Sequence, residues 1–167
     1  MWAKVESNSV TKIYTRPTAL TIGDVNYPQN IMQMWSKSEL EAIGIYEITV
    51  DNTNLKDNKY YTNTDITYAF ASGAVTGTYG TATAKTLADL KTRHKEIINN
   101  KANSRLTKYD WYTLRAASGG TATPSAVTTY QAAVRTKANT HCTSIDAAAN
   151  VDALAALTFD WPTEPTV

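Results

Sequence analysis

Residues 86–106, TLADLKTRHKEIINNKANSRL, mark the point where the hydrophobic pattern of this 167-residue chain changes. Before this stretch apolar and polar residues tend to alternate, which is typical of β-strands. Within it apolar residues recur three or four positions apart, which is typical of one face of an amphipathic helix. We therefore expect an α+β fold, with a β-hairpin-rich half at residues 1–84 and a helical half at residues 85–167. The positions with helical spacing are Leu87, Leu90, Ile97, Ile98 and Leu106.

Two β-hairpins are expected in the first half. Residues 2–14 alternate on either side of a Ser-Asn pair, and Asn8 tolerates the left-handed backbone of a tight turn. Residues 65–81 alternate in the same way on either side of a Ser-Gly pair that ends at Gly73. These two stretches predict antiparallel strand pairs.

One short helix and one further strand are expected between the hairpins. Ser36 and Glu39 have the spacing of a capping box, and Gly44 is placed to end the helix. Residues 45–50, IYEITV, are β-branched and aromatic and predict a strand. The polar residues 51–64 predict a loop.

Three helical segments are expected beyond the long helix of residues 86–106. Asp110 is placed to cap a short helix, and residues 124–141 resume the helical pattern with a proline in the first turn. A third run, residues 144–157, has Ser144 or Asp146 available as its cap.

The charge of the chain is nearly balanced, but it is unevenly distributed. Sixteen basic and fifteen acidic residues leave a net charge of +1, so nothing steers the whole chain toward nucleic acid. Residues 85–115 hold eight basic and three acidic side chains, a local charge of +5. This basic stretch predicts either a solvated helix face or a docking face for an acidic partner protein.

The cysteine content and the hydropathy exclude several classes of protein. Cys142 is the only cysteine, so neither a disulfide framework nor a multi-thiolate metal site is expected. No stretch approaches eighteen consecutive apolar residues, and the N-terminus has no basic head followed by an apolar run. We expect neither a membrane span nor a secretion signal.

The candidate catalytic and metal-binding residues do not form a working set. His141 and Cys142 are adjacent, so on a helix their side chains point about 100° apart. His94 has no second ligand at metal-binding spacing. Asp110 and Asp160 could be imagined as a glycosidase acid pair, but helix capping explains Asp110 more simply. We expect no enzyme, no metal and no cofactor.

The last third of the chain carries a recognisable order of residues. An RLTKYDW stretch comes first, YQAAVR follows, and FDWPTEP comes last. This order resembles the phage tail assembly chaperone family. The chain departs from the family pattern after Arg135, where a second Arg and an Asp-Ile-Pro are missing, and by an Ala-rich insertion at residues 146–157. The matching residues are Arg105, Leu106, Asp110, Trp111, Tyr130, Gln131, Arg135, Trp161, Pro162 and Pro165.

The resemblance implies a small helical module whose ends are held by its tryptophans. Trp111 and Trp161 are expected to be largely buried, packed against each other and against Tyr130. The first half of the chain is similar to the leading domain of phage tail-fibre-region proteins. The expected structural anchors are Asp110, Trp111, Tyr130, Arg135, Trp161 and Pro162.

The implied function is that of a non-enzymatic bacteriophage virion protein, a structural or adaptor component of the tail or tail fibre. It would be made in the host cytoplasm and located in the virion. Its partners would be other tail or fibre proteins, with a homo-oligomer, a trimer in a fibre, as a further possibility. One alternative is a transient tail-fibre assembly chaperone. Another is a glycan-binding receptor-recognition module with exposed Tyr60, Tyr61 and Tyr79 as stacking platforms.

The long helix is the expected contact element for a partner. Its apolar stripe has three- and four-residue spacing but spans fewer than three heptads, and Lys101 interrupts it. In an isolated monomer the stripe is expected to bury itself on the β-rich half. The expected contact residues are Leu87, Leu90, His94 and Ile97.

Overall fold

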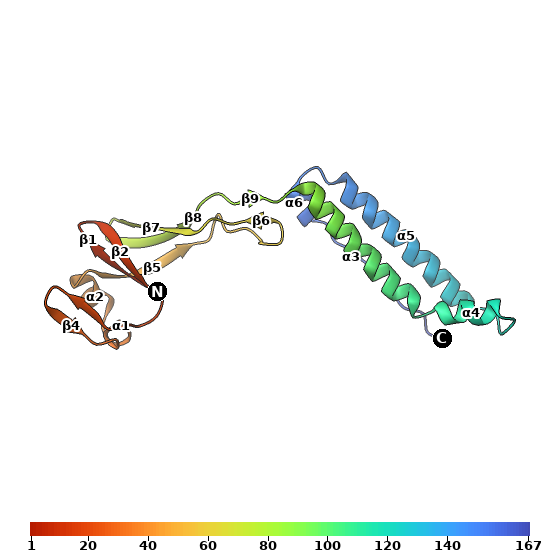
Figure 1. Ribbon diagram of the computed structural model, residues 1–167, viewed down its shortest axis with the longest axis horizontal. Coiled ribbons are helices and arrows are strands. Elements are labelled where there is room, and N and C mark those ends of the chain that lie inside the picture. The colour runs from red at the N-terminus through yellow and green to blue at the C-terminus, as the bar shows by residue number, and fades with distance from the viewer. The chain divides into compact units, whose positions relative to one another are not determined.

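The computed structural model describes all residues from 1 to 167, and the chain divides into two compact units (Figure 1). The first unit is Met1–Thr83 and the second is Ala84–Val167, so the division falls one residue from the expected boundary. The first unit is mainly strands and the second is helical. The predicted α+β class is therefore confirmed.

A five-stranded sheet forms the centre of the first unit, with the strand order β2-β1-β5-β8-β7. Strands β5 and β8 are parallel, and the other neighbouring pairs are antiparallel. The strands are β1 (Trp2–Glu6), β2 (Ser9–Tyr14), β5 (Ile45–Asp51), β7 (Ile66–Ala71) and β8 (Ala74–Tyr79).

Both predicted hairpins are confirmed, and their turns have the expected backbone. Ser7 and Asn8 have φ angles of 49° and 62°, and Ser72 and Gly73 have φ angles of 51° and 75°. Two consecutive positive φ angles match the right-handed twist of the flanking strands. The turns thus set the register of β1 on β2 and of β7 on β8.

The capped helix is also confirmed. In α2 (Lys37–Ala42), the Ser36 hydroxyl accepts from the Glu39 backbone, and the Glu39 carboxylate accepts from the Ser36 backbone. Gly44 follows the helix with a φ of 78°. The remaining elements are β3 (Leu20–Ile22), β4 (Val25–Tyr27), α1 (Ile31–Met34) and β6 (Tyr61–Thr62), together with β9 (Thr83–Ala84), which spans the boundary between the units. Within this group β3 pairs with β4, and β6 pairs with β9.

The first unit has two apolar clusters. The larger one joins β2, β3, the short helices and β5, and it is built from Tyr14, Leu20, Ile31, Met32, Leu40 and Ile45. The smaller one joins β1, β5 and β8 through Ala3, Ile48 and Val75. Strand β5 contributes to both clusters, through Ile45 to the larger one and through Ile48 to the smaller one.

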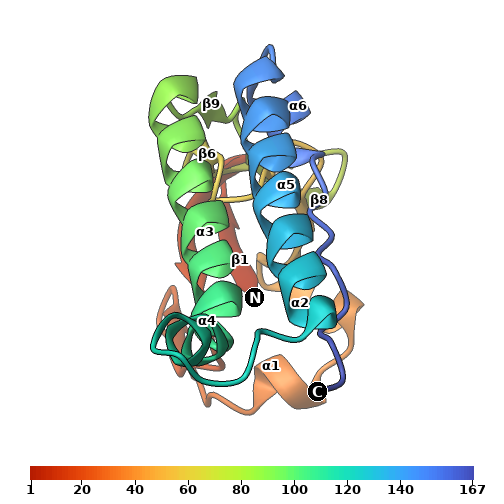
Figure 2. The ribbon, with the colours of Figure 1, turned by 90° about the vertical axis from the view of Figure 1, so that its right-hand side faces the viewer.

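A helical hairpin forms the second unit. Its helices are α3 (Leu87–Thr107), α4 (Asp110–Ala117), α5 (Ser125–Ala147) and α6 (Val151–Ala155). Figure 2 shows α3 and α5 lying side by side. None of these helices combines the length and the apolar character that crossing a membrane requires.

The seam between α3 and α5 corrects three expectations about the apolar stripe. Along α3 the buried residues are four apart, so Ile98 and not Ile97 faces the seam, and Ile97 is 39% exposed. Ala102 continues the row, so Lys101 does not interrupt it. The stripe is covered by α5, and the expectation that a monomer would bury it on the β-rich half was wrong. The facing row on α5 is Val127, Gln131, Val134, Ala138, His141 and Ile145.

Two expected caps in the second unit were also wrong. Helix α5 continues through the residues expected to open the third helix, and the Ser144 hydroxyl donates back to the Thr140 carbonyl at 3.1 Å. Helix α6 is capped by Asn150, whose Oδ1 accepts from the Ala153 backbone at 2.8 Å. Asp110 begins α4, but its side chain makes no capping hydrogen bond.

Candidate interaction site

The last eleven residues, 157–167, form an extended segment on the helical hairpin, which we call the C-terminal strap. Asp160 lies beside Lys137 in the second half of α5, whereas Pro165 lies beside Ser125 at the start of α5. The strap therefore runs antiparallel to α5 (Figure 2). Prolines within it prevent it from continuing as a helix.

Charged side chains hold the strap at two points. The Lys137 ammonium lies 2.7 Å from the Asp160 carboxylate. Farther along, the Lys108 ammonium lies 2.6 Å from the Glu164 carboxylate, and Arg105 lies 3.9 Å from the same oxygen. The strap is thus tied to both long helices.

These ion pairs shift the pKa values of their partners. Hydrogen bonding to Lys108 lowers the pKa of Glu164, and the same contact raises the pKa of Lys108. Hydrogen bonding to Lys137 lowers the pKa of Asp160. The pairing therefore favours the charged form of both carboxylates.

Aromatic packing fixes the first half of the strap. The Phe159 ring lies 5.1 Å from the His141 ring and 6.3 Å from the His94 ring, measured between centroids. The Trp161 ring lies 5.4 Å from the His141 ring. His141 Nε2 is also 2.7 Å from the Asp160 carbonyl oxygen. This buried histidine therefore organises three consecutive strap residues.

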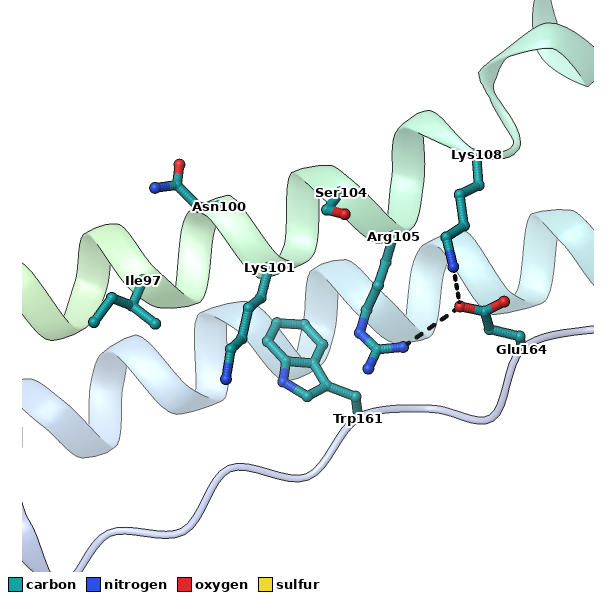
Figure 3. Close-up of a pocket in the computed structure, with 8 residues that line it drawn as sticks. All are labelled: Ile97, Asn100, Lys101, Ser104, Arg105, Lys108, Trp161 and Glu164. Atoms are coloured by element: carbon teal, nitrogen blue, oxygen red, sulfur yellow. Dashed lines mark hydrogen bonds and ion pairs between the residues drawn. The ribbon is translucent and has the colours of Figure 1, made fainter.

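A pocket opens where the strap meets α3 (Figure 3). The Arg105 guanidinium stacks over the Trp161 indole, 5.3 Å from the ring centroid. Lys101 extends beside the same indole in Figure 3, one turn of helix before Arg105. The lining residues are Ile97, Asn100, Lys101, Ser104, Arg105, Lys108, Trp161 and Glu164.

The expectation that both tryptophans would be largely buried was wrong for Trp111. This side chain is 50% exposed, because α4 buries none of its residues. Trp111 packs locally against Tyr112, with ring centroids 3.9 Å apart, and under the Arg115 guanidinium. Trp161, in contrast, is half-buried between the long helices.

The two tryptophans do not clamp the module by packing against each other. Instead, a series of ring and cation contacts links their surroundings. Tyr112 stacks near Tyr109, Tyr109 contacts Tyr130 edge-on at 5.3 Å, and the Tyr130 hydroxyl lies 3.5 Å from Arg105. Arg105 then stacks on Trp161. Three motif residues, Arg105, Tyr130 and Trp161, thus belong to one network, with the exposed Trp111 at its edge.

The other expected anchors are divided between this network and the solvent. Tyr130 is buried, and Pro162 is half-buried against α5 near Ala133. Asp110 and Arg135 are exposed. The structure therefore brings together Arg105, Tyr130, Trp161 and Pro162, and it leaves the other two at the surface.

The expected contact residues on α3 are divided in the same way. Leu90 and His94 are buried, and Leu87 is half-buried, so these three side chains belong to the core of the unit. Ile97 is partly exposed and lines the pocket beside the strap. Of the four, only Ile97 is placed to contact a partner.

His141 and Cys142, which were not expected to act as a pair, contact different partners, and one tyrosine expected to bind glycan is buried. The Cys142 sulfur is 3.9 Å from the Asn99 side-chain oxygen, while the neighbouring His141 faces the strap. No group of three or more His, Cys, Asp or Glu side chains is placed to hold a metal ion. Tyr60, expected as an exposed stacking platform, is buried with the Lys59 ammonium over its ring.

Several residues of the site were missed by the sequence reasoning. Lys108, Lys137 and Phe159 hold the strap, and Glu164 lies near Arg105 of α3 and Lys108, which directly follows α3. The available signal was electrostatic, because the basic stretch of residues 85–115 is matched by acidic residues at the end of the chain. Helical spacing alone carries no information about an extended segment.

Comparison of the chain with protein-family models, curated proteins and solved structures found no match.

Proposed function

We propose that the chain is a non-enzymatic bacteriophage virion protein that acts as a structural adaptor in the tail or tail fibre. The observation that carries the proposal is the convergence of four motif residues. Arg105, Tyr130, Trp161 and Pro162 come from α3, α5 and the strap, yet they lie in or beside one network that holds the strap on the helices. This arrangement gives a structural reason for the motif order that resembles the tail assembly chaperone family.

The two-unit organisation also supports an adaptor. Each unit has its own buried core, so each can present a separate surface to a different partner. The proposed partners are other tail or fibre proteins, and the proposed location is the virion. A homo-oligomer, a trimer within a fibre, belongs to the same proposal.

A second candidate is a tail-fibre assembly chaperone that leaves before the particle is complete. The surface of α4 favours it, because Trp111 is 50% exposed and Leu114 is 67% exposed. An exposed apolar surface of this kind suits binding to a partner. The glycan-binding alternative loses support, because Tyr60 is buried.

Mass spectrometry of purified particles tests the proposal. Particles from the encoding phage would be separated from lysate on a density gradient and washed at high salt. The adaptor proposal expects the chain to remain in the particle fraction. Detection only in the soluble lysate would overturn that proposal and favour the chaperone. An unrelated soluble phage protein, followed in the same fractions, controls for carry-over.

A further inference from the structure

The pocket between α3 and the strap has an apolar floor and a basic rim. Ile97 is 39% exposed, and the Trp161 indole lies across the pocket from α3 in Figure 3. Three basic residues line the pocket, Lys101, Arg105 and Lys108, with Glu164 as the one acidic residue, so the lining has a net charge of +2. Such a lining is complementary to an acidic ligand that also has apolar side chains.

The strap itself demonstrates which chemistry the rim binds. Its carboxylate at Glu164 is held by Lys108 at 2.6 Å and lies 3.9 Å from Arg105. An extended segment with an acidic side chain therefore already occupies one end of the basic row. The ligand at this end belongs to the same chain.

Lys101, at the other end of the basic row formed with Arg105 and Lys108, is unpaired. Two lysines earlier on α3 already have partners within the unit: Lys91 donates to the Asp146 carbonyl, and Lys95 pairs with the Asp146 carboxylate. Lys101 has no ion-pair or hydrogen-bond partner and extends beside the Trp161 indole (Figure 3). Asn100 and Ser104 flank it on α3 and provide further polar groups.

We propose that this pocket binds an extended acidic segment of a partner protein. A partner carboxylate pairs with Lys101, and an apolar side chain next to it packs on Ile97 and Trp161. From Ile97 to Arg105 the helix rises about 12 Å, which an extended peptide covers in about four residues. The inference rests on the proposed adaptor function, because it names the chemistry of the partner that the adaptor holds.

A titration of the ¹⁵N-labelled full-length chain tests the proposal. The probe is the peptide acetyl-Gly-Glu-Leu-Glu-Leu-Glu-Gly-amide, and its control has Gln in place of each Glu. We expect the acidic peptide to shift the Trp161 indole N–H resonance while those of Trp2 and Trp35, which lie in the first unit, stay in place. No binding up to about 1 mM, or equal binding of the Gln peptide, would overturn the proposal.

Charge-reversal variants locate the binding. Lys101→Glu is expected to weaken binding about tenfold, because it opposes a partner carboxylate directly. Arg93→Glu makes the same change of net charge on the same helix, about 12 Å away along the axis. At physiological salt this exceeds the screening length of about 8 Å, so its effect is expected to stay below about twofold. An equal effect of both variants, or no effect of Lys101→Glu, would contradict a specific site.

The peptide titration and the mass spectrometry of particles test the pocket and the adaptor function independently. Lys101 is exposed and unpaired, so its replacement leaves the fold intact, and circular dichroism of both variants checks this. If the wild-type chain does not bind the peptide, the proposal for this pocket is wrong, but the proposed presence of the chain in the particle is unaffected. Peptide binding by a chain that is absent from particles would assign the pocket to the chaperone.

Discussion

Gly44 shows how one residue can be required by both its backbone angle and its neighbours. Its φ is 78°, and a Cβ at this position would lie 3.0 Å from the Val5 carbonyl oxygen. Gly23 has a similar φ of 57° but has open space around it. The two glycines therefore separate the cost of the backbone angle from the cost of a steric clash.

We expect Gly44→Ala to lower the free energy of unfolding by about 2 to 3 kcal/mol. Gly23→Ala should lower it by only about 1 kcal/mol, since it has the backbone cost alone. Urea denaturation followed by circular dichroism measures both. Equal costs would show that the Val5 carbonyl moves away without penalty.

Replacing Trp161 and replacing Trp111 are expected to lower the free energy of unfolding by different amounts. Trp161→Ala should cost about 2 kcal/mol, because it removes half-buried contacts with His141 and Arg105. Trp111→Ala should cost less than about 1 kcal/mol, because half of that side chain is already in solvent. A larger cost for Trp111 would restore the original idea that both tryptophans hold the module together.

The cap of α6 provides a prediction about a single element. Asn150→Ala should lower the free energy of unfolding by about 1 kcal/mol, because it removes the hydrogen bond to the Ala153 backbone. Ser144→Ala is the matched control, since Ser144 lies inside α5 and bonds back to Thr140. Its effect should remain within about 0.5 kcal/mol. Thermal melting of the two variants decides which residue caps a helix.

The C-terminal strap should be sensitive to acid. The lowered pKa values of Asp160 and Glu164 mean that their pairing stabilises the folded chain fully above the ordinary carboxylate pKa. This contribution is lost as the pH falls through the lowered values, below about pH 4. The strap should then loosen while the helices, whose seam is largely apolar, remain folded.

Indole N–H resonances can follow this loosening. As the pH falls, the Trp161 resonance should move toward its unfolded position before the far-ultraviolet helical signal decreases. Trp35, which packs in the first unit, serves as the internal control. Simultaneous loss of both signals would show that the strap is an integral part of the helical core.

Elements with local signals could be predicted from the sequence, whereas those set by distant contacts could not. The hairpin turns and the capping box of α2 depend on residues close in sequence, and they were predicted correctly. The boundary between α5 and α6 was missed because Ser144 and Asn150 are both good caps, and tertiary packing decides between them. The path of the strap was missed because ion pairs between residues more than twenty positions apart hold it.

The candidate site shows the same limit. The basic excess of residues 85–115 was visible in the sequence, and so were Arg105 and Trp161 as motif residues. The stacking of Arg105 on Trp161, and the lack of an ion-pair partner for Lys101, depend on where the strap lies on α3. Ile97 and Ile98 both fit the helical spacing of the stripe, and only the packing of α5 shows that Ile98 is buried and Ile97 is partly exposed.

The two units should fold independently of each other. Each contains more than eighty residues and its own buried apolar residues, which is enough for a small domain. We expect a fragment of residues 84–167 to keep its helical circular dichroism and to unfold cooperatively. An unfolded fragment would show that the helical hairpin depends on the first unit.

The number of copies per particle tests the proposed function most directly. Isotope-labelled peptides of the chain and of a major tail protein would be added to digested, gradient-purified particles as standards for mass spectrometry. A structural adaptor predicts a fixed whole number of copies per particle that does not change with salt washing, and a multiple of three if it belongs to a fibre. Absence from the particles, or a fractional amount that falls with each wash, would contradict a structural role in the virion.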